Sequence, residues 1–150
     1  MTRRQTIPEQ WLIVDRSSPE LWPALWKLSR GSGVLVLREL GRSDNVRLRR
    51  LAKLRALTVV TESPRSAARI HNVQELRLAL LRRTPLLLLS PIYRTHSHPE
   101  WKRLPRMRSA ALASLADRKL IALGGMNARR YAKVAPLGFI GWAGISAFRI

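Results

Sequence analysis

The sequence contains no cysteine and no long apolar run, and each absence excludes a class of protein. Without cysteine, disulfides and thiolate metal sites are excluded, and the composition fits a reducing cytoplasm. No apolar run approaches the roughly 20 residues that a membrane helix needs, and the first residues lack a signal-peptide pattern. We therefore expect a soluble, cytoplasmic protein in which residues 1–150 form a single domain.

Acidic residues are also scarce. Asp and Glu number 9 against 28 Lys and Arg, which gives a net charge of +19 at pH 7. Such a charge attracts polyanions, which include nucleic acids and small phosphorylated ligands. Most basic residues fall in stretches such as RLRRLAKLR, whose apolar positions keep helical spacing, so they indicate solvated helix faces. Aromatic residues, which nucleic-acid modules often interleave with basic ones, make up only 6%. Nucleic acid is therefore unlikely as the main partner and stays an alternative.

Short apolar runs alternate with amphipathic stretches through the whole chain. The runs are continuously apolar, which is typical of strands buried on both faces of a parallel sheet. The predicted strands are 11–14, 33–37, 57–60, 68–72, 86–92, 119–125 and 138–145. The predicted helices lie within 17–30, 45–55, 72–83, 107–118 and 127–136. This rhythm predicts an α/β fold built from βα units.

The helical stretches carry cap residues and tryptophans. Asn72 and Asn127 stand where side chains cap a helix start, and Ser18 followed by Pro19 suggests the same for the first helix. Trp22 and Trp26 of that helix are interpreted as core or interface residues.

Polar residues follow most of the predicted strands. Ligands of parallel βα sheets bind at the carboxyl ends of the strands. Asp15, Arg38, Glu62 and His71 follow early strands, and the fifth ends in the polar loop SPIYRTHSHP. The pair Gly124–Gly125 precedes a helix and can expose backbone N–H groups to an anion. We therefore expect a site for a phosphorylated small molecule at this edge.

Three segments carry a resemblance to a known family. SPIYRTHSHP, KLIALGGMNARR and LGFIGWAGISAF resemble the C-terminal half of the thiamine phosphate synthase and TenI family, and WLIVDR and GVLVLRE match its start more loosely. The resemblance implies a TIM-barrel-like (β/α) parallel barrel. It also implies a transferase that joins hydroxymethylpyrimidine pyrophosphate to thiazole phosphate in thiamine biosynthesis, with magnesium as cofactor and release of pyrophosphate.

The resemblance also assigns expected roles to individual residues. Arg38 would face the pyrophosphate, and His98 stands where the family has a lysine, so both are the catalytic candidates. Glu62 falls near the family's magnesium aspartate, with Asp15 as a second carboxylate. The expected phosphate-binding and substrate-binding residues are Thr95, Ser97, Gly124, Gly125, Ile145, Ser146 and His71.

The chain departs from the family in its length. A barrel of this type typically needs at least ~200 residues, whereas this chain has 150. The missing length lies where only SPRSAARIHN separates the third strand from the third helix, and Arg69 there replaces the usual serine. We therefore expect the barrel to be shortened by about one βα unit. An open sheet edge is a hazard, so a compressed barrel, a covering segment or a homodimer is expected.

Two further interpretations stay open. A catalytically impaired, TenI-like barrel would bind a phosphorylated ligand in a regulatory or accessory role. His71, His96 and His98 suggest a zinc site, although an HxH pair in a loop often occurs by chance and no cysteine supports it. No pattern of a nucleophilic hydrolase is present.

Overall fold

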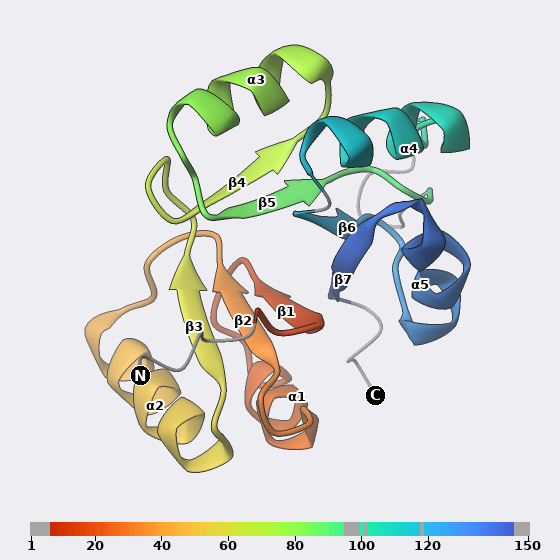
Figure 1. Ribbon diagram of the computed structural model, residues 1–150. Coiled ribbons are helices and arrows are strands. Elements are labelled where there is room, and N and C mark those ends of the chain that lie inside the picture. Colours follow the sequence, from red (N-terminus) through yellow and green to blue (C-terminus); the bar gives the residue numbers. More distant parts are fainter. Residues whose placement is uncertain (1–6, 95–99, 101, 118, 146–150) are drawn as a thin grey trace, which may run out of the picture.

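The computed structural model describes residues 7–94, 100, 102–117 and 119–145 of the chain. Strand and helix alternate within this part of the chain, apart from one direct step from β3 to β4 (Figure 1). The strands are β1 (Gln10–Val14), β2 (Gly33–Val36), β3 (Thr58–Thr61), β4 (Ala67–Ile70), β5 (Leu86–Leu89), β6 (Leu120–Leu123) and β7 (Phe139–Gly144). The helices are α1 (Leu21–Lys27), α2 (Arg42–Arg55), α3 (Val73–Leu81), α4 (Arg106–Leu115) and α5 (Ala128–Val134), followed by the 3-10 turn η1 (Ala135–Leu137).

The seven strands form one curled sheet in the order β3-β2-β1-β7-β6-β5-β4. Every pair of neighbouring strands is parallel, and β7 pairs with β1 as the last strand of a barrel does. The two outer strands, β3 and β4, follow each other in sequence and are joined by the five residues 62–66, with no helix between them. The sequence therefore predicted the fold class correctly: this is a shortened TIM-barrel-like sheet that remains open between β3 and β4.

This opening, which we call the seam, lies where the sequence predicted the missing βα unit. The one pairing described there is an isolated antiparallel bridge between Ser63 and Ala67. A crossover helix is what normally returns the chain to the start of the next parallel strand. Without it, β4 begins near the end of β3 and runs in a different direction (Figure 1), so the two strands do not pair along their length.

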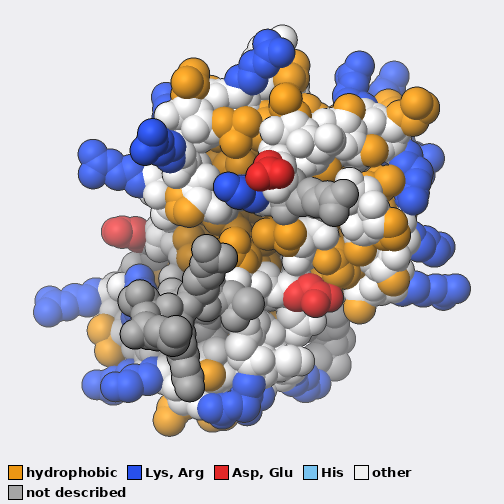
Figure 2. Space-filling model, viewed as in Figure 1, with side chains coloured by type: hydrophobic (Ala, Val, Ile, Leu, Met, Phe, Trp, Pro, Cys, Tyr) orange, Lys and Arg blue, Asp and Glu red, His pale blue; other side chains and the backbone are white. Residues whose placement is uncertain are grey.

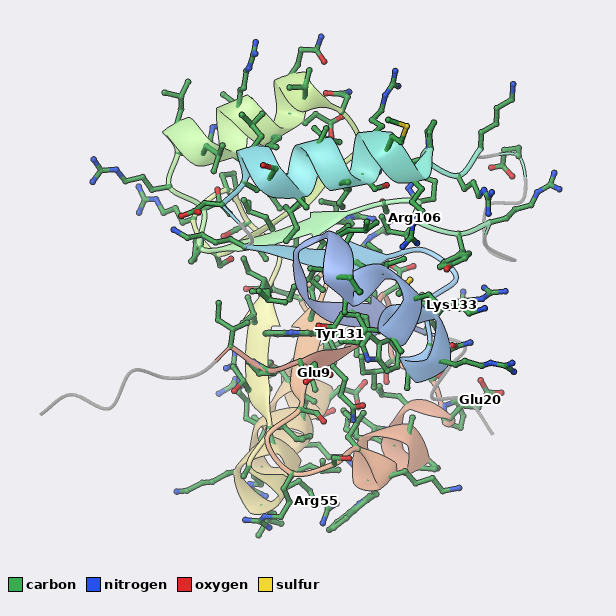
Figure 3. The ribbon with its side chains drawn as sticks, turned by 45° about the vertical axis from the view of Figure 1, so that its right-hand side comes forward. Glu9, Glu20, Arg55, Arg106, Tyr131 and Lys133 are labelled. Carbon is green, nitrogen blue, oxygen red and sulfur yellow. The ribbon has the colours of Figure 1, made fainter. Side chains whose placement is uncertain are left out.

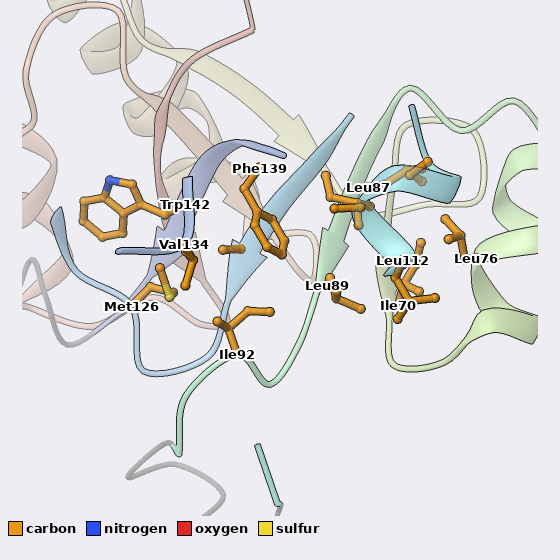
Figure 4. Packing of buried hydrophobic residues seen from close by; sticks show 14 of the residues in the cluster. Ile70, Leu76, Leu87, Leu89, Ile92, Leu112, Met126, Val134, Phe139 and Trp142 are labelled. Carbon is orange, nitrogen blue, oxygen red and sulfur yellow. The ribbon is translucent and has the colours of Figure 1, made fainter. Parts of the chain in front are cut away.

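Three groups of buried side chains hold the layers together. One packs α1 and α2 against the outer face of β1 and β2, and a second packs α3, α4 and α5 against β4 to β7 (Figure 4). The third consists of inward-facing strand residues, including Trp11, Leu35, Leu88 and Ile121, and fills the concave face. Because the sheet is covered by helices outside and by its own side chains inside, its strands carry the continuous apolar runs seen in the sequence.

The helix starts agree with the sequence in two cases and differ in one. The side chains of Asn72 and Asn127 accept hydrogen bonds from the third residue of α3 and α5, as predicted. Ser18 does not cap α1, which begins at Leu21 after a turn in which the Leu21 N–H donates to the Ser18 carbonyl. Pro23 thereby falls in the first turn of α1, where its missing N–H costs nothing.

None of the helices in the described part of the chain is long and apolar enough to cross a membrane. Lys and Arg side chains project around the outline of the face seen in Figure 2, and hydrophobic side chains gather towards its middle. The Lys and Arg residues of the helices are exposed or partly exposed, as the sequence predicted.

Candidate functional site

Polar residues follow the strands at one edge of the sheet. Since all the neighbouring strands are parallel, their carboxyl ends share this edge. Asp15 follows β1, Glu62 follows β3, and Ile145 follows β7. Arg38, His71 and the Gly124–Gly125 pair follow β2, β4 and β6 in the same way. The structure thus brings these residues to one edge, while their roles as ligands stay predictions.

Arg38 and Asp15 lie next to each other on the paired strands β1 and β2. The Leu37 N–H donates to the Val14 carbonyl at 2.8 Å, which keeps the ends of the two strands together. The Arg38 Nε then lies 3.6 Å from Asp15 Oδ1, with side chains that are 82% and 54% exposed. An ion pair this exposed contributes little to stability, so Arg38 remains accessible to an anionic ligand.

Glu62 forms the closest ion pair of the described residues, and its partner is Arg69 of β4. The Arg69 Nε donates to one carboxylate oxygen at 2.7 Å and Nη2 donates to the other at 3.0 Å. Side chains alternate along a strand, so Arg69 shares the inner face with Ala67, which belongs to the concave core. This two-bond contact spans the seam and occupies both oxygens of the expected magnesium carboxylate.

His71 follows β4 and is held by the first turn of α3. Its backbone N–H donates to Glu75 Oε2 at 2.9 Å, and its Nδ1 lies 3.0 Å from the same oxygen. Asn72 caps the helix by accepting from the Glu75 N–H at 2.9 Å. Glu75 therefore fixes the position of the imidazole, whose side chain is 41% exposed.

The Gly124–Gly125 turn lies directly beneath the loop that follows β5. Both glycines have positive φ values, +103° and +59°, which disfavour a side chain. A Cβ on Gly125 would lie 2.6 Å from the Arg94 carbonyl oxygen, and one on Gly124 would lie 2.8 Å from Pro91. The Tyr93 N–H also donates to the Gly124 carbonyl at 3.1 Å. Chain geometry alone therefore requires both glycines, whether or not a ligand is present.

Arg130 is the cation of this turn, and sequence reasoning missed it. Its Nη1 donates to the Gly125 carbonyl, and its guanidinium carbon lies 4.7 Å from the centre of the Tyr93 ring. Its backbone N–H is bound by the cap residue Asn127 at 2.8 Å. Its position in the sequence could have indicated it, because Arg130 is the third residue of the helix that follows the glycine pair and so lies near the expected phosphate site. One of five guanidinium N–H groups is used in the Gly125 contact, which leaves donors for an anion.

Several predicted site residues lie outside the described part of the chain. These are the two catalytic or metal-site histidines and the three hydroxyl residues of the expected phosphate loops: His96, His98, Thr95, Ser97 and Ser146. The described portion of the polar loop nevertheless packs on the glycine turn. The predicted roles of these residues stay predictions.

The described side chains do not fit a magnesium site. Magnesium prefers several oxygen ligands around one position. In the described ranges no three residues among His, Asp and Glu lie close enough together to hold a metal ion. Glu62 is bound to Arg69 through both oxygens, and Asp15 lies beside Arg38.

The chain resembles known proteins in its fold alone. No family model matches the chain, and none of the curated proteins matches it. Among solved structures, the chain is similar to thiamine phosphate pyrophosphorylase from Bacteroides thetaiotaomicron. That similarity has a TM-score of 0.56 at 15% identity and covers 93% of this chain and 83% of that chain. The chain therefore shares its fold, at a distance, with a thiamine phosphate pyrophosphorylase.

Proposed function

We propose that this protein binds a phosphorylated small molecule at the carboxyl edge of its sheet. The observation that carries the proposal is Arg130, which stacks on Tyr93 and contacts the Gly125 carbonyl beside the turn after β6. Arg38 adds a second accessible cation at this edge. A phosphate ester is the ligand that such guanidinium groups favour, because they offer several aligned N–H donors to its oxygens.

The distant likeness to a thiamine phosphate pyrophosphorylase supports thiazole phosphate or thiamine phosphate as the ligand. The role is that of a TenI-like accessory or regulatory protein in thiamine biosynthesis. The Glu62–Arg69 pair supports this role over catalysis, since Arg69 binds both oxygens of the carboxylate that falls near the family's magnesium aspartate.

Calorimetric titration with thiazole phosphate tests this proposal, with the unphosphorylated thiazole alcohol as the matched ligand. We expect Arg130→Ala to weaken binding of the phosphate by about tenfold or more, because a charged hydrogen bond is removed. Arg129→Ala, an exposed arginine one position away on α5, should bind as the unchanged protein does. Equal affinity for the phosphate and the alcohol would contradict the proposal.

A second candidate is the transferase itself, and Arg38 is the observation that favours it. In that reaction the thiazole nitrogen bonds to the pyrimidine methylene carbon while the C–O bond to pyrophosphate breaks. Arg38 lies at the end of β2 and would offset the negative charge of the leaving group. Assay of thiamine phosphate formation from both precursors with added magnesium tests it. Formation that Arg38→Ala abolishes supports the enzyme, and no product at high protein concentration overturns it.

A further inference from the structure

Two tryptophans of α1 lie against two arginines of α2, on the outer side of the sheet. The Arg47 guanidinium carbon lies 4.0 Å from the centre of the Trp22 ring. The Arg55 guanidinium carbon lies 5.8 Å from the Trp26 ring and its Nη2 donates to the Leu28 carbonyl at 3.0 Å. Trp22 is buried, with 9% of its surface exposed, whereas Trp26 is 54% exposed. An indole this exposed offers a flat ring to a partner.

Helix α2 supplies a dense row of cations beside these rings. Its 14 residues include one acidic side chain, Asp44, and six basic ones, which are Arg42, Arg47, Arg49, Arg50, Lys53 and Arg55. Figure 3 shows Arg55 at the far end of this helix. The sequence argued against nucleic acid because aromatics are not interleaved with basic residues along the chain. The fold interleaves them in space instead, with rings from α1 and cations from α2.

Two shallow hollows run along this face and meet at Arg47. One, of about 680 Å³, is lined by residues of α1 and of the preceding turn, among them Ser18, Trp22 and Trp26. The other, of about 570 Å³, is lined along α2 by Ser43, Val46 and Arg50. Together they form a track with exposed aromatic surface at one end and arginines along the rest, which we call the α1–α2 track.

The chemistry of the track distinguishes among polyanionic partners. An anionic membrane would need a broad apolar face, whereas the exposed apolar side chains of α1 and α2, which are Trp26, Val46 and Leu54, lie among arginines. A duplex keeps its bases stacked on each other, so an exposed ring gains nothing from it. An unpaired strand offers both phosphates for the arginines and free base faces for Trp26. We propose that the α1–α2 track binds single-stranded nucleic acid, with a base stacked on Trp26 and the backbone held by Arg47 and Arg50.

Fluorescence anisotropy with a labelled oligothymidylate of about ten nucleotides tests this proposal. We expect Trp26→Ala to weaken binding by about five- to 150-fold, the range measured for loss of one base-stacking contact. Leu81→Ala, which removes an exposed apolar side chain from α3, should leave binding unchanged and is the matched control.

Charge reversal separates a local site from the overall charge of the protein. Arg47→Glu with Arg50→Glu should weaken binding strongly and reduce its salt dependence. Arg77→Glu with Arg82→Glu changes the net charge by the same amount at two exposed positions, one on α3 and one directly after it, and should have a small effect. Equal losses in the two double variants would overturn the proposal, because binding would then follow net charge alone.

Two competitors test whether a base stacks on Trp26. A polysulfate such as heparin and vesicles of phosphatidylserine both carry negative charge without bases. If either binds unchanged protein as tightly as the oligonucleotide does and is equally weakened by Trp26→Ala, the site is not a nucleic-acid site. Circular dichroism of each variant confirms that the fold is retained, so that lost binding reflects the lost side chain.

Discussion

At the scale of single residues, two glycines with positive φ differ in what lies around them. Gly31 has φ +83° and nothing within 4 Å of an added Cβ. Gly125 has φ +59° and a carbonyl oxygen 2.6 Å from the same position. Alanine variants of the two residues can therefore be compared to measure the free-energy cost of placing a Cβ against a neighbouring backbone carbonyl.

Gly31→Ala should destabilise the protein by about 1–2 kcal/mol, the cost of a left-handed conformation for a residue with a Cβ. Gly125→Ala should cost about 1–3 kcal/mol more, because the β5 loop must also move. Urea unfolding of both variants measures the difference. Equal losses would mean that the loop does not rest on the glycine turn in solution.

Tyr131 is the titrating residue that the fold perturbs most clearly among those described. Burial, and secondarily the charge of Glu9, raise the pKa of Tyr131 above its ordinary value. Its hydroxyl donates to the Phe139 carbonyl at 3.2 Å, and Figure 3 shows it close to Glu9. The folded protein therefore favours the neutral phenol.

A raised pKa stabilises the fold below the unfolded value, about 10 for tyrosine, and this stabilisation is lost as pH rises through the higher folded value. The free energy of unfolding should therefore fall more steeply above about pH 10 in the unchanged protein than in Tyr131→Phe. Urea unfolding across this range measures the slope. Glu9→Gln should lower the pKa of Tyr131 slightly, which ultraviolet titration of the phenol detects; parallel slopes in both proteins would contradict this account.

At the scale of elements, the strands were predictable and their closure was not. Each predicted strand overlaps an observed one, because apolar runs buried on both faces mark strands directly in sequence. The helix caps at Asn72 and Asn127 were also predictable, since capping depends on neighbours within one turn. The Glu62–Arg69 pair was not, because it depends on how β3 and β4 approach each other after a helix is lost.

The same limit applies to the candidate site. The parallel sheet places Arg38, Glu62 and Gly124 at one edge. The alternation of strands and helices along the sequence predicts such a sheet, so this placement was predictable. Arg69 binds Glu62 across the seam and Arg130 stacks on Tyr93 of the β5 loop, so the sequence showed both arginines without showing these partners. Trp26 was interpreted as a core or interface residue, and its exposed fraction of 54% excludes a place in the core. Helix α1 begins at Leu21, two residues after the predicted first helical position, Pro19.

The pair across the seam gives a prediction at this scale. Glu62→Gln and Arg69→Ala should each destabilise the protein, and the double variant should show a coupling energy of about 1 kcal/mol, near the upper end for a partly exposed ion pair of good geometry. A double-mutant cycle in urea measures it. The coupling should fall in high salt, and a value near zero would show that the pair does not stabilise the contact across the seam.

At the scale of the whole molecule, the net charge of +19 governs behaviour in salt. Like charges on the helical surface repel each other and destabilise the compact state. Raising NaCl from ~10 mM to ~150 mM shortens the screening length from about 30 to about 8 Å. We therefore expect the melting temperature to rise by a few degrees over this range.

Scanning calorimetry or circular dichroism measures this rise. Phosphate at the same ionic strength is the matched comparison, because screening is then equal and any extra stabilisation reflects anion binding. A melting temperature that falls with salt would mean that ion pairs stabilise the protein more than repulsion destabilises it.

The pairing of β1 with β7 has a mechanical consequence. The two strands are parallel neighbours in the middle of the sheet, joined between Gln10 and Trp142 and between Leu12 and Gly144. Tension applied at residue 10 and residue 144 in opposite directions pulls along both strands. The bonds between them are then loaded together in shear. Under force the protein should yield abruptly at this centre, and the seam between β3 and β4, which lies off the line of tension, should bear almost none of the load.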